Sequence, residues 1–148
     1  MALDQSFVGR TFSPVEPYVV GIEKIREFAS AIGDDNPISH STEAAASAGH
    51  GGLVASPTFA IAAVARAQDA VVFDPALGLD FSRVVHGDQR FVHHRPIIAG
   101  DVLTCSVTVD SIRALGSNDV LTLRAELTLA DGTPVTTAVS SLVARGTA

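Results

Sequence analysis

Apolar side chains recur at spacings of three and four residues in two stretches of the N-terminal half of the chain. In residues 22–32 charged side chains fill the positions between them, which predicts an amphipathic helix that ends at Gly33. From Phe59 to about Val72 nearly every residue is alanine, valine or another apolar type. A helix that is apolar on almost all sides is a buried helix. The second helix is therefore expected at the centre of the molecule.

Apolar and polar residues alternate in the C-terminal half. Leucine and alanine alternate with threonine, arginine and glutamate across residues 121–129, as in a half-buried antiparallel strand. The same alternation predicts four strands near residues 83–95, 101–113, 119–130 and 135–145. The pair Asp131-Gly132 is a strong hairpin signal. The chain is thus predicted to be one α+β domain, residues 1–148, with a curled antiparallel sheet wrapped around one long buried helix.

The sequence Ser-Pro-Thr at residues 56–58 marks the expected start of the buried helix. Serine is a common N-cap residue, and proline is favoured at the first helical position. The start of a helix offers free backbone N–H groups and the positive end of the helix dipole. Pro57 has no N–H, so donors to a ligand oxygen would come from Ser56, Thr58 and Phe59.

The composition of the 148 residues, with 47% apolar and 18% charged side chains, is that of a folded globular protein. No apolar run approaches the roughly 20 residues that a membrane-spanning helix needs, and the N-terminus has no signal-peptide pattern. We therefore expect a cytoplasmic protein without membrane insertion. The net charge is −6 and no basic cluster is present, which argues against a nucleic-acid partner.

The sequence indicates neither a metal site nor a resident cofactor. Cys105, the single cysteine, alternates with apolar residues in a predicted strand and is expected to be a buried, unreactive thiol. His93 and His94 are adjacent in a strand and should point to opposite faces. Together with His86 they lack any zinc-ligand spacing. No glycine-rich phosphate-binding motif is present.

The most informative segment is residues 33–40, GDDNPISH, directly after the first helix. A carboxylate and an imidazole on one short loop can act as paired proton-transfer groups. The same residues have a structural interpretation, because aspartate and asparagine often satisfy backbone groups in turns. His40 could equally be a surface loop residue.

Three segments together resemble the MaoC-like dehydratase/hydratase family of the hot-dog fold. Residues 33–38 resemble its signature G-D-x-N-P-[IL]-H. Residues 51–56, GGLVAS, resemble the glycine segment that precedes the central helix in the family. Residues 91–101, FVHHRPIIAGD, resemble F-x-x-x-x-P-[VI]-x-x-G-D. Residues 88–91, DQRF, are most similar to the actinobacterial (3R)-hydroxyacyl-ACP dehydratase subunits that work in two-subunit complexes.

The resemblance implies a hydro-lyase of fatty-acid metabolism that adds or removes water at the trans-2,3 double bond of an acyl thioester. It implies Asp34 and His40 as the catalytic pair, with coenzyme A or acyl carrier protein as the carrier of the substrate and no other cofactor. It also implies a homodimer or a heterodimer with another MaoC-like subunit. The substrate-binding residues it implies are Asn36, Ser39, Gly51, Gly52, Ser56, Thr58 and Phe59.

The chain departs from the signature at one position. The signature places its histidine where this chain has Ser39, and His40 follows one residue later. Either the loop bulges and His40 takes the catalytic place, or the chain is the non-catalytic acyl-binding subunit of a heterodimeric dehydratase. A hot-dog acyl-CoA thioesterase is a third possibility, which the Asn36-Pro37 pair disfavours. The carrier, the acyl chain length and the identity of the partner stay open.

Overall fold

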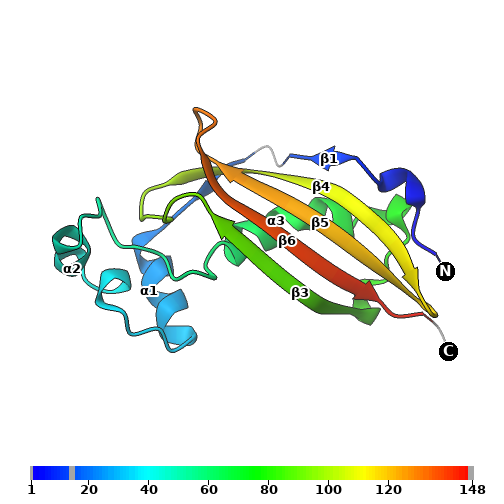
Figure 1. Cartoon of the computed structure of the whole chain (residues 1–148), viewed down its shortest axis with the longest axis horizontal. Helices are drawn as coiled ribbons and strands as arrows, with labels where there is room; N and C mark the ends of the chain where they lie inside the picture. Colours follow the sequence, from blue (N-terminus) through cyan, green and yellow to red (C-terminus); the bar gives the residue numbers. More distant parts are fainter. Residues whose placement is uncertain (1, 14–15, 147–148) are drawn as a thin grey trace.

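The computed structural model describes residues 2–13 and 16–146. Six antiparallel strands form a curled sheet in the order β1-β4-β5-β6-β3, with β2 also paired to β4. Helix α3 lies against one face of this sheet, and the two other helices lie beyond the end of the long strands (Figure 1). The predicted α+β architecture, with a sheet curled around one helix, is confirmed.

The four long strands match the predicted ones to within a few residues, because the period-two alternation of apolar residues dictates which face is buried. In β5, for example, the leucines and the alanine at odd-numbered positions are buried and their neighbours are half-exposed. The strands are β1 (Thr11–Phe12), β2 (Tyr18–Val19), β3 (Val84–His93), β4 (Val102–Leu115), β5 (Asn118–Thr128) and β6 (Pro134–Ala144).

The helices include the two predicted over residues 22–32 and 59–72. They are α1 (Ile22–Ala31), α2 (Thr42–Ser47) and α3 (Ile61–Val72), with short 3₁₀ turns at Gln5–Phe7, Pro37–Ser39, Pro75–Leu77 and Phe81–Arg83. None of the helices in the described part of the chain is long and apolar enough to cross a membrane.

The central helix begins two residues later than predicted, and Ser56 is not its N-cap. Residues 57–60 form tight turns, in which the N–H of Phe59 donates to the carbonyl of Ser56. Ala60 occupies the N-cap position without a side-chain hydrogen bond. The prediction was wrong here because the Ser56 hydroxyl bonds a distant carboxylate instead of the start of its own helix.

The sheet buries one side of α3, not all of it. Ala63, Val64, Ala67 and Val71 pack into the core. A stripe on the opposite side of the helix stays exposed and consists of Ala65, Arg66, Asp69 and Ala70. The small side chains on the buried side let the curled sheet approach the helix closely.

Strand β3 forms an edge of the sheet. It pairs with β6 along one side, and no strand in the described ranges pairs with its other side. A bulge between His86 and Asp88 shifts its register. The glycine at the bulge, Gly87, lies close to β6, since an added Cβ would come within 3.3 Å of the Ser141 carbonyl oxygen. An open edge of this kind can pair with a strand from another chain.

We predict that Phe59→Ala will destabilise the protein by about 3–5 kcal/mol, the usual cost of truncating a fully buried phenylalanine. The Phe59 ring is 0% exposed and packs edge-on against Tyr18 and Phe28 with ring centroids 6.4 and 5.4 Å away. Urea unfolding measures the change. Phe73→Ala is the matched control, because Phe73 is 57% exposed and should cost no more than about 1.5 kcal/mol. Equal losses at the two positions would contradict this view of the core.

Candidate functional site

The loop at residues 33–40 is shaped by its own backbone. Gly33 adopts a positive φ of 74°, which suits glycine and turns the chain away from α1. The N–H of Asp34 donates to the carbonyl of Ala29 at 2.8 Å. The Asn36 side chain accepts a hydrogen bond from the N–H of Ile38 at 3.2 Å and so caps the next turn. Asn36 therefore holds the loop, as asparagine often does in turns.

The Asp34 carboxylate accepts two hydrogen bonds. The Ser56 hydroxyl donates to Oδ2 at 2.5 Å, and the N–H of Asn36 donates to Oδ1 at 3.0 Å. These bonds hold the pKa of Asp34 below its ordinary value, the Ser56 bond being the larger cause. The carboxylate is thus a fixed, ionised group beside the start of the central helix.

The His40 ring is folded back onto its own loop. Its Nε2 lies 2.7 Å from the main-chain carbonyl oxygen of Asp34. A carbonyl can only accept, so Nε2 carries the proton in this arrangement. The His40 carbonyl in turn accepts a hydrogen bond from Arg26 Nε at 3.1 Å. The hydrogen bond of the imidazole therefore goes to the main chain of Asp34 and not to its carboxylate.

Ser39 occupies the position of the signature histidine and is 2% exposed. Its hydroxyl donates to the carbonyl of Val54 at 2.6 Å, and the N–H of Val54 donates to the carbonyl of Ile38 at 2.9 Å. These two bonds attach the loop to the segment at residues 53–56. The Ser39 side chain is thus a structural contact in the single chain.

The segment at residues 53–56 is held on its other side by the turn at residues 96–101. The N–H of Ala55 donates to the carbonyl of Ile97, and the N–H of Ala99 donates to the carbonyl of Leu53, each at 2.9 Å. Gly52 permits this approach, because an added Cβ would lie 3.3 Å from the Ile98 side chain. An added Cβ at Gly51 would meet open space.

An ion pair fixes the turn at residues 96–101. Arg95 donates two hydrogen bonds to the Asp101 carboxylate, at 2.8 and 3.0 Å. Asp101 also accepts a bond from the N–H of Ile98 at 2.9 Å. The Arg95 guanidinium is therefore neutralised within the chain and shapes the turn.

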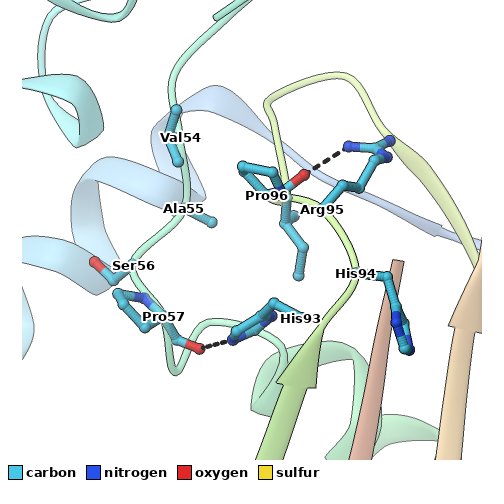
Figure 2. Close-up of a pocket in the computed structure, with 9 residues that line it drawn as sticks. Val54, Ala55, Ser56, Pro57, His93, His94, Arg95 and Pro96 are labelled. Carbon is cyan, nitrogen blue, oxygen red and sulfur yellow. Dashed lines mark hydrogen bonds between the residues drawn. The ribbon is translucent and has the colours of Figure 1, made fainter. Parts of the chain in front are cut away.

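A cavity of about 430 Å³ lies between the segment before the central helix and the segment after β3 (Figure 2). Its walls are formed by Val54, Ala55, Ser56, Pro57, His93, His94, Arg95, Pro96 and Ile97. Asp34 and His40 do not line it. Ser56 joins the two regions, since it lines the cavity while its hydroxyl points away from His93 and bonds Asp34.

The sequence interpretation did not assign His93 and His94 to this cavity. The motif at residues 91–101 contained them but served only as a family marker. His93 Nε2 lies 2.8 Å from the carbonyl of Pro57, and His94 Nε2 lies 3.0 Å from the Thr137 hydroxyl. Of the predicted helix-start donors, the N–H of Phe59 is already bonded to Ser56, and Thr58 lines a separate groove.

The remaining reactive groups fit structural roles. Burial raises the pKa of the Cys105 thiol to about 12, and the nearby Glu126 charge acts in the same direction. Cys105 is therefore a neutral thiol at physiological pH. Within residues 2–13 and 16–146, no group of three or more histidine, cysteine, aspartate or glutamate side chains could hold a metal ion.

The curled sheet around one helix is the hot-dog fold of the MaoC-like dehydratases. The family model described as "FAS1-like, dehydratase domain region" matches residues 6–138. The chain belongs to this family. It is 58% identical over 148 residues to a "UPF0336 protein" of Saccharopolyspora erythraea, covering 100% of this chain and 95% of that protein.

Solved structures agree with this assignment. A chain of the C-terminally truncated HadBC (3R-hydroxyacyl-ACP dehydratase) complex of Mycobacterium tuberculosis is 32% identical, with a TM-score of 0.87. The match covers 97% of this chain and 99% of that chain. R-hydratase PhaJ1 of Pseudomonas aeruginosa shares the fold at 19% identity, with a TM-score of 0.71 over 95% of this chain and 83% of that chain.

We predict that Ser56→Ala will raise the pKa of Asp34 toward its ordinary value of 3.8, because it removes the stronger of the two donors. The pKa of Asp34 is lower in the folded chain than in the unfolded chain. The hydrogen bonds to its carboxylate therefore stabilise the fold at pH values above the unfolded-state pKa. This stabilisation is lost as the pH falls through the folded-state pKa. The variant should therefore lose less stability on acidification than the wild type.

A titration of the Asp34 carboxyl carbon by NMR measures this shift. Ser82→Ala is the control, because the Ser82 hydroxyl bonds Asp80 instead. An Asp34 pKa that stays unchanged in Ser56→Ala would show that Ser56 does not hold the carboxylate in solution.

Proposed function

We propose that this chain is the acyl-binding subunit of a two-chain (3R)-hydroxyacyl-thioester dehydratase of fatty-acid metabolism. A second MaoC-like subunit supplies the complete aspartate and histidine pair. The observation that carries the proposal is the hydrogen bonding of Ser39 and His40. The signature position holds a buried serine bonded to Val54, and the adjacent imidazole is bonded to the main chain of Asp34.

The reaction explains why this arrangement matters. Dehydration removes a proton from C2 of the acyl group while the 3-hydroxyl leaves as water. One protein group accepts the first proton, and one donates a proton to the leaving oxygen. Misplacing such a group by about 1 Å costs on the order of 100-fold in rate. An imidazole that donates Nε2–H to its own loop is poorly placed for either transfer.

The free edge of β3 supports a second subunit. One wall of the cavity is formed by the segment that follows β3. A strand added along the free edge of β3 would therefore lie beside the cavity. By their names, the HadBC complex and the ChsH1-ChsH2 complex of Mycobacterium tuberculosis each contain two kinds of chain. The ChsH1-ChsH2 structure shares the fold at 17% identity, with a TM-score of 0.73 over 93% of this chain and 98% of that chain. We infer that this chain likewise pairs with a different MaoC-like subunit.

The cavity suits the acyl part of a thioester. Its walls include Val54, Pro57, Pro96 and Ile97, which favour an apolar chain. The thioester, carried by coenzyme A or acyl carrier protein, would lie toward the start of the central helix, where the helix dipole favours negative charge on its carbonyl oxygen.

A second candidate is a hydratase that works without a different partner. The ionised, hydrogen-bonded Asp34 carboxylate favours it, because a proton acceptor is already held in place beside the start of the central helix. In that case Asp34 and His40 are the proton-transfer pair, and His40 must leave its bond to the Asp34 main chain during the reaction.

Hydration of crotonyl-CoA, followed as loss of enoyl-thioester absorbance, separates the two candidates. The chain is assayed alone and after co-expression with a MaoC-like subunit that carries the full signature. We expect no turnover by the chain alone, and a complex that is faster than either subunit. His40→Ala in this chain should leave kcat of the complex unchanged, because its ring takes no part in the proton transfers.

The second candidate predicts the reverse. The chain alone is then active, and His40→Ala or Asp34→Ala lowers its kcat by about 10²- to 10⁴-fold, the usual effect of losing a general acid or base. Release of free thiol from acyl-CoA, detected with a thiol-reactive dye, would instead indicate a thioesterase and contradict both candidates.

A further inference from the structure

Two apolar hollows lie on either side of the turn that leads into the central helix. One is the cavity described above, which includes Pro57 in its wall. The other is a groove of about 390 Å³ that includes the next residue, Thr58. We call it the β3 groove, and its walls are Thr58, Ile61, His86, Gln89 and Phe91.

The His93 side chain contacts a wall residue of each hollow. Its Nε2 lies 2.8 Å from the carbonyl oxygen of Pro57, and its Nδ1 lies 3.0 Å from the Thr136 hydroxyl. Its ring stacks on Phe91, with centroids 5.9 Å apart and an interplanar angle of 17°. Figure 2 shows the ring reaching from the end of β3 to Pro57. His93 lines the cavity and stacks on Phe91, which lines the groove, so we take the imidazole to be the partition between them.

The hydrogen bond between His93 and the Pro57 carbonyl lies at the surface of the single chain. His93 is an exposed residue in the single chain, and exposed side chains change rotamer rapidly. Its partner Thr136 is fully buried, and leaving a buried hydroxyl unbonded is unfavourable. The closed position is therefore preferred without a ligand, while a ligand that gains enough apolar contact can displace the ring.

The β3 groove includes a polar residue whose orientation is fixed. Gln68 Nε2 on α3 donates to the Ser140 hydroxyl at 2.9 Å, and that hydroxyl donates to Gln89 Oε1 at 2.6 Å. Gln89 and Ser140 are directly opposite each other on β3 and β6. Gln89 is therefore held in place as a polar residue in the wall of the groove, between Phe91 and His86 along β3.

We propose that His93 determines the acyl chain length that this subunit accepts. Short chains end in the cavity, against the imidazole. Longer chains displace the ring from Pro57 and continue along the β3 groove toward Gln89. The inference rests on the proposed function, because it takes the ligand to be an acyl chain.

Dissociation constants for saturated acyl-CoAs, from butyryl-CoA to dodecanoyl-CoA, test the proposal. They are measured by calorimetry with the full chain, alone and in the two-subunit complex. Each CH₂ group that becomes buried should tighten binding about fourfold. For the wild type we expect this gain to stop once the cavity is full. For His93→Ala we expect it to continue to chains longer by two or more CH₂ groups.

Two further variants distinguish the loss of the His93 partition from a general effect of substitution on folding. His93→Phe keeps a ring that fills the gap and stacks on Phe91, and its chain-length profile should stay that of the wild type. Val92→Ala truncates the neighbouring residue on the opposite face of β3, and its profile should also be unchanged. Thermal unfolding confirms that each variant is folded.

Each outcome is decisive. If the wild type binds acyl-CoA but His93→Ala has the same profile, or if His93→Phe shifts the profile as much as His93→Ala, the role of His93 is refuted and the proposed function stands. If neither acyl-CoA nor the same acyl chains on acyl carrier protein bind to the wild type in either form, the proposed function fails and the inference fails with it.

Discussion

The segment at residues 53–56 must satisfy its backbone hydrogen bonds on two sides at once, and the site depends on that constraint. The loop at residues 33–40 bonds Val54 on one side. The turn at residues 96–101 bonds Leu53 and Ala55 on the other. Buried backbone groups without partners are costly, so these three parts are fixed relative to one another. The Ser56 hydroxyl then lies within hydrogen-bonding distance of the Asp34 carboxylate, a few residues before the central helix begins.

The sheet and the helices could be predicted from the sequence because their signals are local. Alternation over residues 121–129 set the buried face of β5, and the alanine-rich run identified the central helix. The start of that helix was misplaced, because the fate of the Ser56 hydroxyl depends on a carboxylate 22 residues away. Local capping rules contain no information about such a partner.

The candidate site was predictable only in part for the same reason. The signature located Asp34 and Asn36, and each of them accepts a hydrogen bond from a backbone N–H two residues later in the same loop. The direction of the His40 ring depends on how the loop folds back on itself, which residue spacing does not reveal. The contact between His93 and Pro57 joins residues 36 apart. Only the closed fold brings them together.

The chain of hydrogen bonds from Gln68 through Ser140 to Gln89 also has a consequence for assembly. It ties the outermost strand to the core by bonds of fixed direction. A strand slipped by one residue would point its side chains to the wrong face, and this tie resists such slippage. A chain that docked on this edge would therefore meet a strand whose register is already held by the core, and the alignment of the two sheets would follow from it.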